Sequence, residues 1–335
     1  MMKAKYLGVK LQLRGRNMIG QYEETMIKRA MSYAYTLMNL RGGGLDRALI
    51  AKRVWESCAI PAILYCVEAL TIKKSTVIEL ERIQNMIGRF ILQVPMSTSR
   101  GLAWIDAGLM PMMYRIQIKQ ALFIFNIIKT KHNPTLLNIL RESLEHPSDP
   151  YTKSWMNIQA QVGLIQNFTK KQHLQAAITH KAVAYVLSVK RQHSTLNTTP
   201  QPWSWFKMQN HVNDSKGSKY LCQVRGGNAQ LGNRYKNRYG FKYEFCPHCE
   251  INGLNFKLTE THVIFECPIV ASRRRELKLS KFMATYKSKG PLANFRILRK
   301  YLGGDGSNGK TLMERGRKLA TIIESWLTAV HEPTQ

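Results

Sequence analysis

The amino-acid sequence predicts a mainly α-helical protein with a short β segment near its amino end and a small cysteine- and histidine-containing module near its carboxyl end. Long stretches place apolar residues every three to four positions, one early stretch alternates apolar with polar residues, and one compact window has metal-ligand spacing. At 335 residues the chain is long enough for two or three compact units, and its 44% hydrophobic content excludes a wholly disordered protein.

The alternating stretch is Lys5–Leu13, which we expect to form one β-strand. No second strand is predicted nearby, and a strand without a partner leaves its backbone groups unpaired. We therefore expect this strand to be the last piece of a sheet whose other strands lie upstream of residue 1.

Helical periodicity takes over after this strand and dominates the next 170 residues. Pro61 predicts a kink in the second helix, and Thr76 with Glu79 has the sequence pattern of a capping box. A polar, proline-containing stretch at Thr198–Pro202 predicts a linker. The predicted helices cover residues 21–40, 45–70, 76–92, 111–129 and 154–189.

Four residues near the carboxyl end have the spacing C-x2-C-x12-H-x4-C: Cys246, Cys249, His262 and Cys267. Three thiolates and one imidazole can close a tetrahedron around zinc, and the two-residue gap lets both sulfurs of a tight turn point inward. Four protein ligands leave no open position for a catalytic water, so the pattern predicts a structural zinc site.

The second half of this motif predicts a short helix at His262–Glu266, with Thr259 and Thr261 as candidate caps and Pro268 ending it. His248 is an alternative ligand; we favour His262 because Cys267 follows it at knuckle-like spacing. Cysteine usage fits an intracellular protein, in the cytoplasm or nucleus, and the remaining cysteines are predicted to be buried thiols. These are Cys58, Cys66 and Cys222.

The charge balance is strongly basic: 50 Lys and Arg against 21 Asp and Glu give a formal net charge of +29 and a pI near 10.1. Such a chain needs a partner with dense negative charge, and RNA and DNA are the leading candidates. An anionic membrane is the weaker alternative, because no run of 18 or more apolar residues occurs. We expect no small-molecule substrate.

Basic and aromatic residues interleave before the Cys/His motif, and an arginine run follows it. Cations neutralise phosphates while flat rings stack unpaired bases, so this composition predicts contacts with single-stranded nucleic acid. The alternative is a solvated basic loop. The predicted contacts are Arg225, Arg234, Tyr235, Lys236, Arg238, Tyr239, Lys242, Arg273, Arg274 and Arg275.

Several stretches together resemble the carboxyl-terminal part of a non-LTR (LINE-type) retrotransposon reverse transcriptase, and they occur in the same order. The first three resemble the end of the palm and the thumb, and the last three resemble the basic segment and zinc knuckle at the carboxyl end of such polyproteins. They are Lys5–Val9, Ile60–Leu70, Ala107–Pro111, Leu221–Arg238, Cys246–Cys249 and His262–Pro268.

The resemblance implies five parts: residues 1–20 as the end of the palm, 21–129 as a helical thumb, 130–215 as a helical connector with a polar linker, 216–285 as the basic segment with a CCHC zinc knuckle, and 286–335 as a helical tail. In the family the thumb closes on the template–primer duplex. Basic residues that could face its phosphates are Arg14, Arg16, Lys28, Arg29, Arg41, Lys52, Arg53, Lys73 and Lys74.

Polymerisation in that family uses paired palm aspartates that hold two divalent metals. The aspartates of this chain are each isolated in sequence: Asp46, Asp106, Asp149, Asp214 and Asp305. We therefore expect no catalytic residues here and a polymerase site upstream of residue 1. The expected function is nucleic-acid binding by a fragment; the alternatives are a decayed fragment without selected function and a domesticated zinc-knuckle protein.

One further pattern, Gly304–Thr311, satisfies the phosphate-loop motif G-x4-G-K-[ST]. That loop binds nucleotides only when it joins a strand to a helix. The preceding residues allow either strand or helix, and only 24 residues follow Thr311. We expect a glycine-rich turn between two carboxyl-terminal helices.

Overall fold

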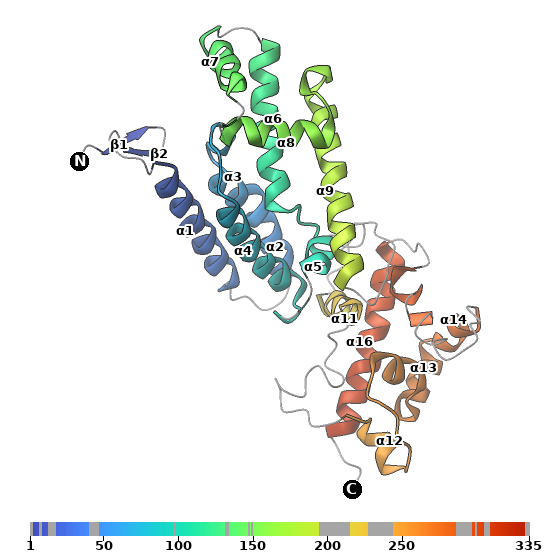
Figure 1. Cartoon of the computed structure of the whole chain (residues 1–335). Coiled ribbons are helices and arrows are strands. Elements are labelled where there is room, and N and C mark those ends of the chain that lie inside the picture. The colour runs from blue at the N-terminus through green and yellow to red at the C-terminus, as the bar shows by residue number, and fades with distance from the viewer. Residues whose placement is uncertain are drawn as a thin grey trace. The chain divides into compact units, whose positions relative to one another are not determined.

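The structure is a computed structural model, and it is mainly helical (Figure 1). None of its described helices is both long and apolar enough to cross a lipid bilayer. The residues that it describes are 3–6, 9–12, 18–39, 47–96, 98, 100–130, 134–146, 148, 150–193, 215–226, 244–285, 297–298, 300–304 and 309–331.

The chain divides into two compact units whose segments alternate along the sequence. Unit 1 comprises Met1–Arg41, Leu49–Gly88 and Leu109–Ser188, and unit 2 comprises Gly42–Ala48, Arg89–Gly108 and Val189–Gln335. This grouping reflects packing alone, so it does not test the division into five parts that the family resemblance implies. That division stays a prediction.

The amino-terminal β segment differs from the prediction. Strands β1 (Lys3–Tyr6) and β2 (Val9–Gln12) pair antiparallel, with Tyr6 opposite Val9 and Lys3 opposite Gln12. The prediction of one strand over Lys5–Leu13 is therefore wrong. Each strand finds its hydrogen-bonding partner in its own sequence neighbour, so the pairing does not require an upstream sheet.

Unit 1 is built from helices that follow this hairpin. Apolar residues at helical spacing give each longer helix one buried face. The elements are α1 (Met18–Met38), α2 (Arg47–Val54), η1 (Trp55–Ala59), α3 (Ile60–Ile63), η2 (Val67–Ala69), α4 (Lys74–Leu92), α6 (Met112–Thr130), α7 (Pro134–Glu145), α8 (Pro150–Val162), η3 (Ile165–Asn167) and α9 (Lys171–His193).

The predicted helix over residues 45–70 ends early and is not simply kinked. Trp55–Ala59 forms a π-helical turn in which the backbone N–H of Ile60 donates to the carbonyl of Trp55. Pro61 has no N–H to donate, so one helical hydrogen bond is missing at this point. The wider π turn, which is separated from Pro61 by Ile60, accommodates this missing bond. The helix stops after Ile63, and Cys66 then adopts a left-handed backbone with φ of 64°.

The predicted helix over residues 154–189 is in fact α8 and α9, separated by a break. Gly163 has φ of +88°, and its N–H donates to the carbonyl of Gln159 at 2.8 Å. This is the way in which a glycine commonly ends a helix, because a residue with a Cβ is strained at this φ. The sequence did not predict this helix end, because helical periodicity continues on both sides of Gly163.

The side chains of four helices and η3 make one core in unit 1. The apolar face of α6 lies at its centre, with α8 and α9 contributing large side chains. The buried members are Tyr114, Ile118, Ala121, Ile124, Phe125, Leu140, Trp155, Ile158, Ile165, Leu174, Ile178 and Ala182.

The irregular segment after α3 is held by side chains from three helices. Its backbone carbonyls cannot all be paired within a helix, so they need other donors. α1, α6 and α8 supply them. The bonds run from Tyr22 to the carbonyl of Tyr65, from Tyr151 to that of Glu68 and from Gln120 to that of Leu70, and Arg29 donates to the carbonyl of Ala62 within α3.

Two of the three cysteines predicted to be buried are not. Cys58 is exposed and Cys66 is half-buried, whereas Cys222 is buried. Cys58 falls on the solvent side of the π turn, which shifts the helical register away from the one that regular periodicity predicts.

Unit 2 is organised around its longest helix, α16 (Gly309–His331). α11 (Ser215–Arg225) packs on it so closely that a Cβ atom at Gly316 would lie 2.5 Å from the carbonyl oxygen of Gly217. The other elements are α5 (Arg100–Ala107), α12 (Pro247–Ile251), η6 (His262–Glu266), η7 (Pro268–Val270), α13 (Ala271–Glu276), α14 (Leu279–Thr285) and η8 (Lys300–Gly304).

A buried ion pair joins three elements of unit 2. Nε and Nη2 of Arg225 each lie 3.0 Å from an oxygen of Asp106, and Nη1 donates to the carbonyl of Leu302. The two side chains are 5% and 0% exposed. α5, α11 and η8 therefore meet at one satisfied charge pair, which the isolated position of Asp106 in the sequence did not reveal.

The glycine-rich pattern Gly304–Thr311 lies between two helical elements, η8 and α16, as predicted, although residues 305–308 are outside the described part. The element before it is helical and not a strand. The strand-to-helix context that a nucleotide-binding loop requires is therefore not met.

Removing one partner of the buried ion pair is expected to destabilise unit 2. Asp106→Asn leaves the buried guanidinium of Arg225 without a counter-charge, which costs about 3–5 kcal/mol in comparable pairs. Urea unfolding followed by circular dichroism measures the loss.

The matched control is Glu79→Gln, which breaks the exposed 2.6 Å pair with Arg82 and should change stability by less than about 1 kcal/mol. Equal effects of the two substitutions would contradict the role given to the buried pair.

Candidate metal centre

The first two cysteines are placed by a short turn that begins in a β-bridge between Phe245 and Lys257. The backbone N–H of Cys246 donates to the carbonyl of Phe256 at 2.8 Å, which fixes Cys246 at the start of α12. The carbonyl of Cys249 accepts from the N–H of Leu254 at 2.8 Å. Both sulfurs are thus carried by a backbone whose own hydrogen bonds are satisfied.

The second pair of donor residues is placed by η6. The predicted short helix over His262–Glu266 is present as a π-helical turn, in which the N–H of Cys267 donates to the carbonyl of His262 at 2.7 Å. The hydroxyl of Thr259 accepts from the N–H of His262 at 3.1 Å, so Thr259 is a cap. Thr261 makes no side-chain cap.

These two turns bring all four predicted ligands together. One donor atom from each of Cys246, Cys249, His262 and Cys267 lies within 4.8 Å of all the others, and all four residues are buried. Sγ of Cys246 and Sγ of Cys267 are 3.7 Å apart, and Sγ of Cys249 lies 3.4 Å from Nε2 of His262. The cluster could hold a metal ion. His248, the alternative ligand, is half-buried and is not in this cluster.

A carboxylate fixes the orientation of the histidine ring. Nδ1 of His262 lies 3.3 Å from Oε2 of Glu266, and its other ring nitrogen faces Cys249. A proton on Nδ1 leaves Nε2 with its lone pair toward the cluster, which is the tautomer that a metal requires. The ring of Phe256 stacks on the imidazole at 5.1 Å between centroids and 17° between planes. Glu266 and Phe256 were not predicted as site residues, although Glu266 could have been found from its helical spacing to His262.

The electrostatics of the sulfurs favour a bound cation. A hydrogen bond from Cys267 lowers the pKa of Cys246 to about 3, with smaller contributions from His262 and Trp326 of α16. Burial, together with the charge of Cys246, raises the pKa of Cys249 to about 11. The pKa of Cys267 is raised because its proton is shared with Cys246. One thiolate therefore suppresses ionisation of the other two thiols at neutral pH, and a cation among them would reverse this.

The metal-ligand turns pack on α16 instead of standing alone. η6, η7 and α13 all contact that helix. Val263, Ile264 and Phe265 of η6 are buried, as are Ile323 and Trp326 of α16. The predicted boundary at residue 285 between knuckle and tail therefore separates segments that share packing.

The predicted nucleic-acid contacts have different surroundings. The guanidinium of Arg225 is buried in its pair with Asp106, so the structure removes Arg225 from the predicted contacts. Arg275, Arg53 and Lys74 are exposed. Lys52 is half-buried. The remaining predicted contacts before the motif lie outside the described residues: Arg234, Tyr235, Lys236, Arg238, Tyr239 and Lys242.

Three other predicted contacts have partners within the chain. Lys73 lies 3.5 Å from the carboxylate of Glu23, and Arg273 lies 2.8 Å from that of Glu276. Arg274 is half-buried, donates to the carbonyl of Glu266 at 3.4 Å, and has a pKa lowered by burial. Only the Arg273–Glu276 pair has both side chains exposed, and such a pair exchanges readily for phosphate because it contributes little stability.

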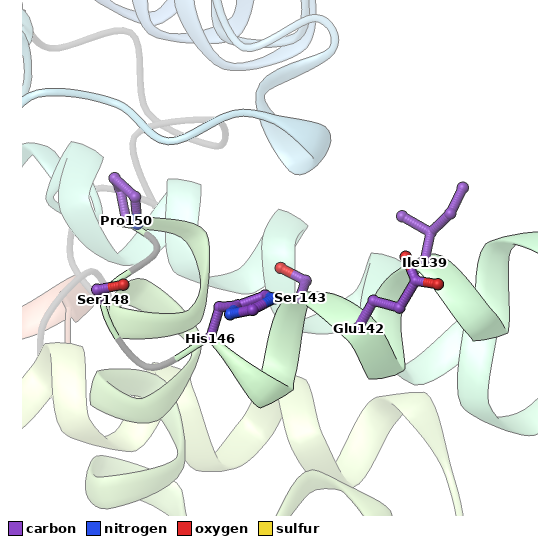
Figure 2. Close-up of a pocket in the computed structure, with 6 residues that line it drawn as sticks. All are labelled: Ile139, Glu142, Ser143, His146, Ser148 and Pro150. Atoms are coloured by element: carbon purple, nitrogen blue, oxygen red, sulfur yellow. The ribbon is translucent and has the colours of Figure 1, made fainter.

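A hollow in unit 1 lies beside α7 and the start of α8 (Figure 2). It has a volume of about 650 Å³ and is lined by Ile139, Glu142, Ser143, His146, Ser148 and Pro150. Serine, histidine and glutamate together could form a hydrolytic triad, but the carboxylate of Glu142 points toward Ile139 and away from His146 (Figure 2). We therefore assign no chemistry to this hollow.

Metal affinity is expected to rise with pH, because Cys249 and Cys267 hold their protons at neutral pH and must lose them to bind a cation, whereas Cys246 is already ionised. Binding should release about two protons per metal ion at pH 7. Calorimetry in buffers of different ionisation enthalpy measures this number. Release of no protons would contradict the cysteine ligation.

Glu266→Gln is expected to weaken metal binding by about 10-fold or more, because the neutral amide orients the imidazole less strongly. Competition against a chelator of known affinity measures the change. Glu276→Gln, on the same surface but paired only with Arg273, is the control and should leave metal affinity unchanged.

No protein-family model, no curated protein and no solved structure matches the chain.

Proposed function

We propose that the cluster of Cys246, Cys249, His262 and Cys267 binds one zinc ion, and that the chain is a nucleic-acid-binding protein whose carboxyl-terminal unit is stabilised by that zinc. The observation that carries the proposal is the buried set of three sulfurs and one imidazole nitrogen within 4.8 Å of one another. Soft thiolates with imidazole are the donor set that zinc prefers in structural sites.

The distances within the cluster support zinc. Zinc–sulfur bonds of about 2.3 Å and zinc–nitrogen bonds of about 2.0–2.1 Å give tetrahedral edges of about 3.8 Å between sulfurs and about 3.6 Å between sulfur and nitrogen. Cys246 and Cys267 are 3.7 Å apart, and Cys249 is 3.4 Å from His262. Two opposite edges of the tetrahedron thus have nearly the required length.

Four protein ligands make this zinc structural. A catalytic zinc needs an open position for water or substrate, and a complete set of three thiolates and one imidazole leaves none. The role that follows is to hold α12 and η6 together against α16, as in small domains where metal binding provides folding free energy.

Nucleic acid is the partner that the charge supports. The net charge of +29 is distributed over both units, and described exposed cations occur on α2, α4 and α13. The metal-ligand turns themselves carry exposed Glu244, Glu250 and Glu266 against exposed Lys257. Phosphate contacts therefore belong to other surfaces than the metal-ligand turns, namely α13 in unit 2 and, separately, α2 and α4 in unit 1.

The resemblance to the carboxyl-terminal part of a LINE-type reverse transcriptase gives this proposal a more specific form. The chain then corresponds to the end of a palm, a thumb, a connector and a zinc knuckle, which bind RNA and DNA without polymerising. Its five aspartates are isolated in sequence, which supports the absence of polymerase activity. Incorporation of labelled nucleotide on a primed RNA template by the pure chain would contradict it.

The zinc proposal is tested by elemental analysis of the purified chain. We expect about one zinc per chain, lost in Cys249→Ser, because a serine hydroxyl does not replace a thiolate ligand. The matched control is Cys58→Ser, since Cys58 is exposed and outside the cluster; it should keep the metal. Absence of zinc in the unaltered chain would favour the decayed-fragment alternative.

Nucleic-acid binding is tested by its salt dependence, because a chain of this charge holds any polyanion at low salt. Replacing Arg53 and Lys74 by Gln should reduce the slope of log K against log salt on duplex DNA by about 1.8 if each contacts one phosphate.

The control replaces two other exposed cations of unit 1, Lys153 and Lys171, by Gln and so removes the same total charge. It should leave the slope nearly unchanged. Equal slopes for both double variants would mean that Arg53 and Lys74 contribute only general charge.

A further inference from the structure

A small cavity lies in unit 2, and none of the four clustered ligands is among its described lining residues. It has a volume of about 140 Å³, and its walls come from the residues at the start of α14, from η8 and from the first turns of α16. Sites for drug-sized molecules are larger, about 300–1,000 Å³. This cavity therefore suits a group of few heavy atoms.

An arginine with a fixed orientation lines the cavity. The guanidinium of Arg315 lies 4.9 Å from the ring centroid of Phe282 and 5.2 Å from that of Tyr301. Its Nη1 donates to the carbonyl of Lys300 at 3.2 Å and to that of Tyr301 at 3.0 Å. Stacking and hydrogen bonds hold the planar group in one position, so little side-chain entropy remains to be lost when it binds a ligand.

The charge of the cavity wall is positive. Among the described residues, Lys278, Arg315 and Lys318 line it together with the carboxylate of Glu314. That carboxylate is already 2.9 Å from Lys318. Hydrogen bonding and charge from Lys318, then the charges of Arg315 and Arg317, lower the pKa of Glu314. An anion entering the cavity would also meet the side chains of Lys278 and Arg315.

Two hydroxyl-bearing residues add hydrogen-bonding capacity. Tyr301 is 2% exposed, and its hydroxyl has no hydrogen-bond partner in the described part of the chain. Thr311 lies in the first turn of α16, where backbone N–H groups and the helix dipole favour negative charge. An oxyanion with several acceptor oxygens matches such donors better than a single carboxylate does.

We propose that this cavity binds a phosphate group of a nucleic-acid strand. The phosphate chemistry follows from the cavity itself, whereas its source in a nucleic acid rests on the proposed function. Arg315 supplies the oriented guanidinium, Lys278 an exposed ammonium, and Thr311 in the first turn of α16 a hydroxyl.

The cavity also accounts for part of the phosphate-loop pattern in the sequence. Thr311 is the last residue of that match and lines the cavity, whereas the strand required for nucleotide binding is replaced by the helical η8. In a phosphate loop the threonine hydroxyl binds Mg²⁺ and the loop backbone binds the phosphates, so the pattern itself does not argue for a nucleotide here. The ligand is a phosphate group and not a nucleoside triphosphate.

The first measurement is line broadening of inorganic phosphate in ³¹P spectra of the zinc-loaded chain. Lys278→Gln should weaken phosphate binding by about 10-fold, because it removes one charge-assisted contact. Lys281→Gln also removes one positive charge, from a residue of α14 that does not line the cavity, and should change phosphate binding less than twofold. Arg315→Lys, which keeps the charge and loses the stacked fork, should weaken binding as Lys278→Gln does. No broadening, or equal loss in both lysine variants, would overturn the site.

The second measurement is the affinity of the same variants for a single-stranded DNA 15-mer at 150 mM salt. Lys278→Gln should weaken it several-fold relative to Lys281→Gln. If phosphate binding falls and oligonucleotide binding does not, the cavity takes free phosphate and its assignment to nucleic acid is wrong. If the unaltered chain binds phosphate but no oligonucleotide, the proposed function fails while the phosphate site stands.

Discussion

Three cysteine sulfurs buried within 4.8 Å of one another cannot all be thiolates unless a cation lies among them. Without one, the proton shared by Cys246 and Cys267 and the raised pKa of Cys249 keep the cluster only partly ionised. The surrounding structure agrees with this constraint, since η6 orients His262 through Glu266 and the turns pack on α16. The proposed function therefore requires a cation in this cluster, and the donor set favours zinc.

Both units hold irregular backbone in place with buried polar contacts, and such backbone commonly carries function. In unit 1, the carbonyls of the segment from Ala62 to Leu70 accept hydrogen bonds from α1, α6 and α8. In unit 2, the Arg225–Asp106 pair joins α5, α11 and η8. Each unit also carries exposed cations, so the proposed phosphate binding would require no rearrangement of either core. The structure also separates arginines that look alike in sequence, since Arg225 is structural and Arg275 is exposed.

Helical fold class and the set of clustered ligands could be predicted, because both depend on local spacing: 3.6-residue periodicity for helices, and two tight turns for the donor pairs. The hairpin, the π turn before Pro61 and the break at Gly163 were not predicted, because each is a local departure inside a longer regular pattern. The partner of Arg225 could not be predicted either, because Asp106 lies 119 residues away and no local signal joins them. For this reason the basic stretch around Arg225 predicts a phosphate contact, where the structure has a buried ion pair.

X-ray absorption at the zinc edge would show which atoms bind the metal in this cluster. The account predicts three sulfurs at about 2.3 Å and one nitrogen at about 2.0–2.1 Å, with no bound water. A shell of oxygen and nitrogen alone, or a chain purified without zinc, would contradict it. In that case the cluster of Cys246, Cys249, His262 and Cys267 would be four buried side chains that share a site without sharing a metal.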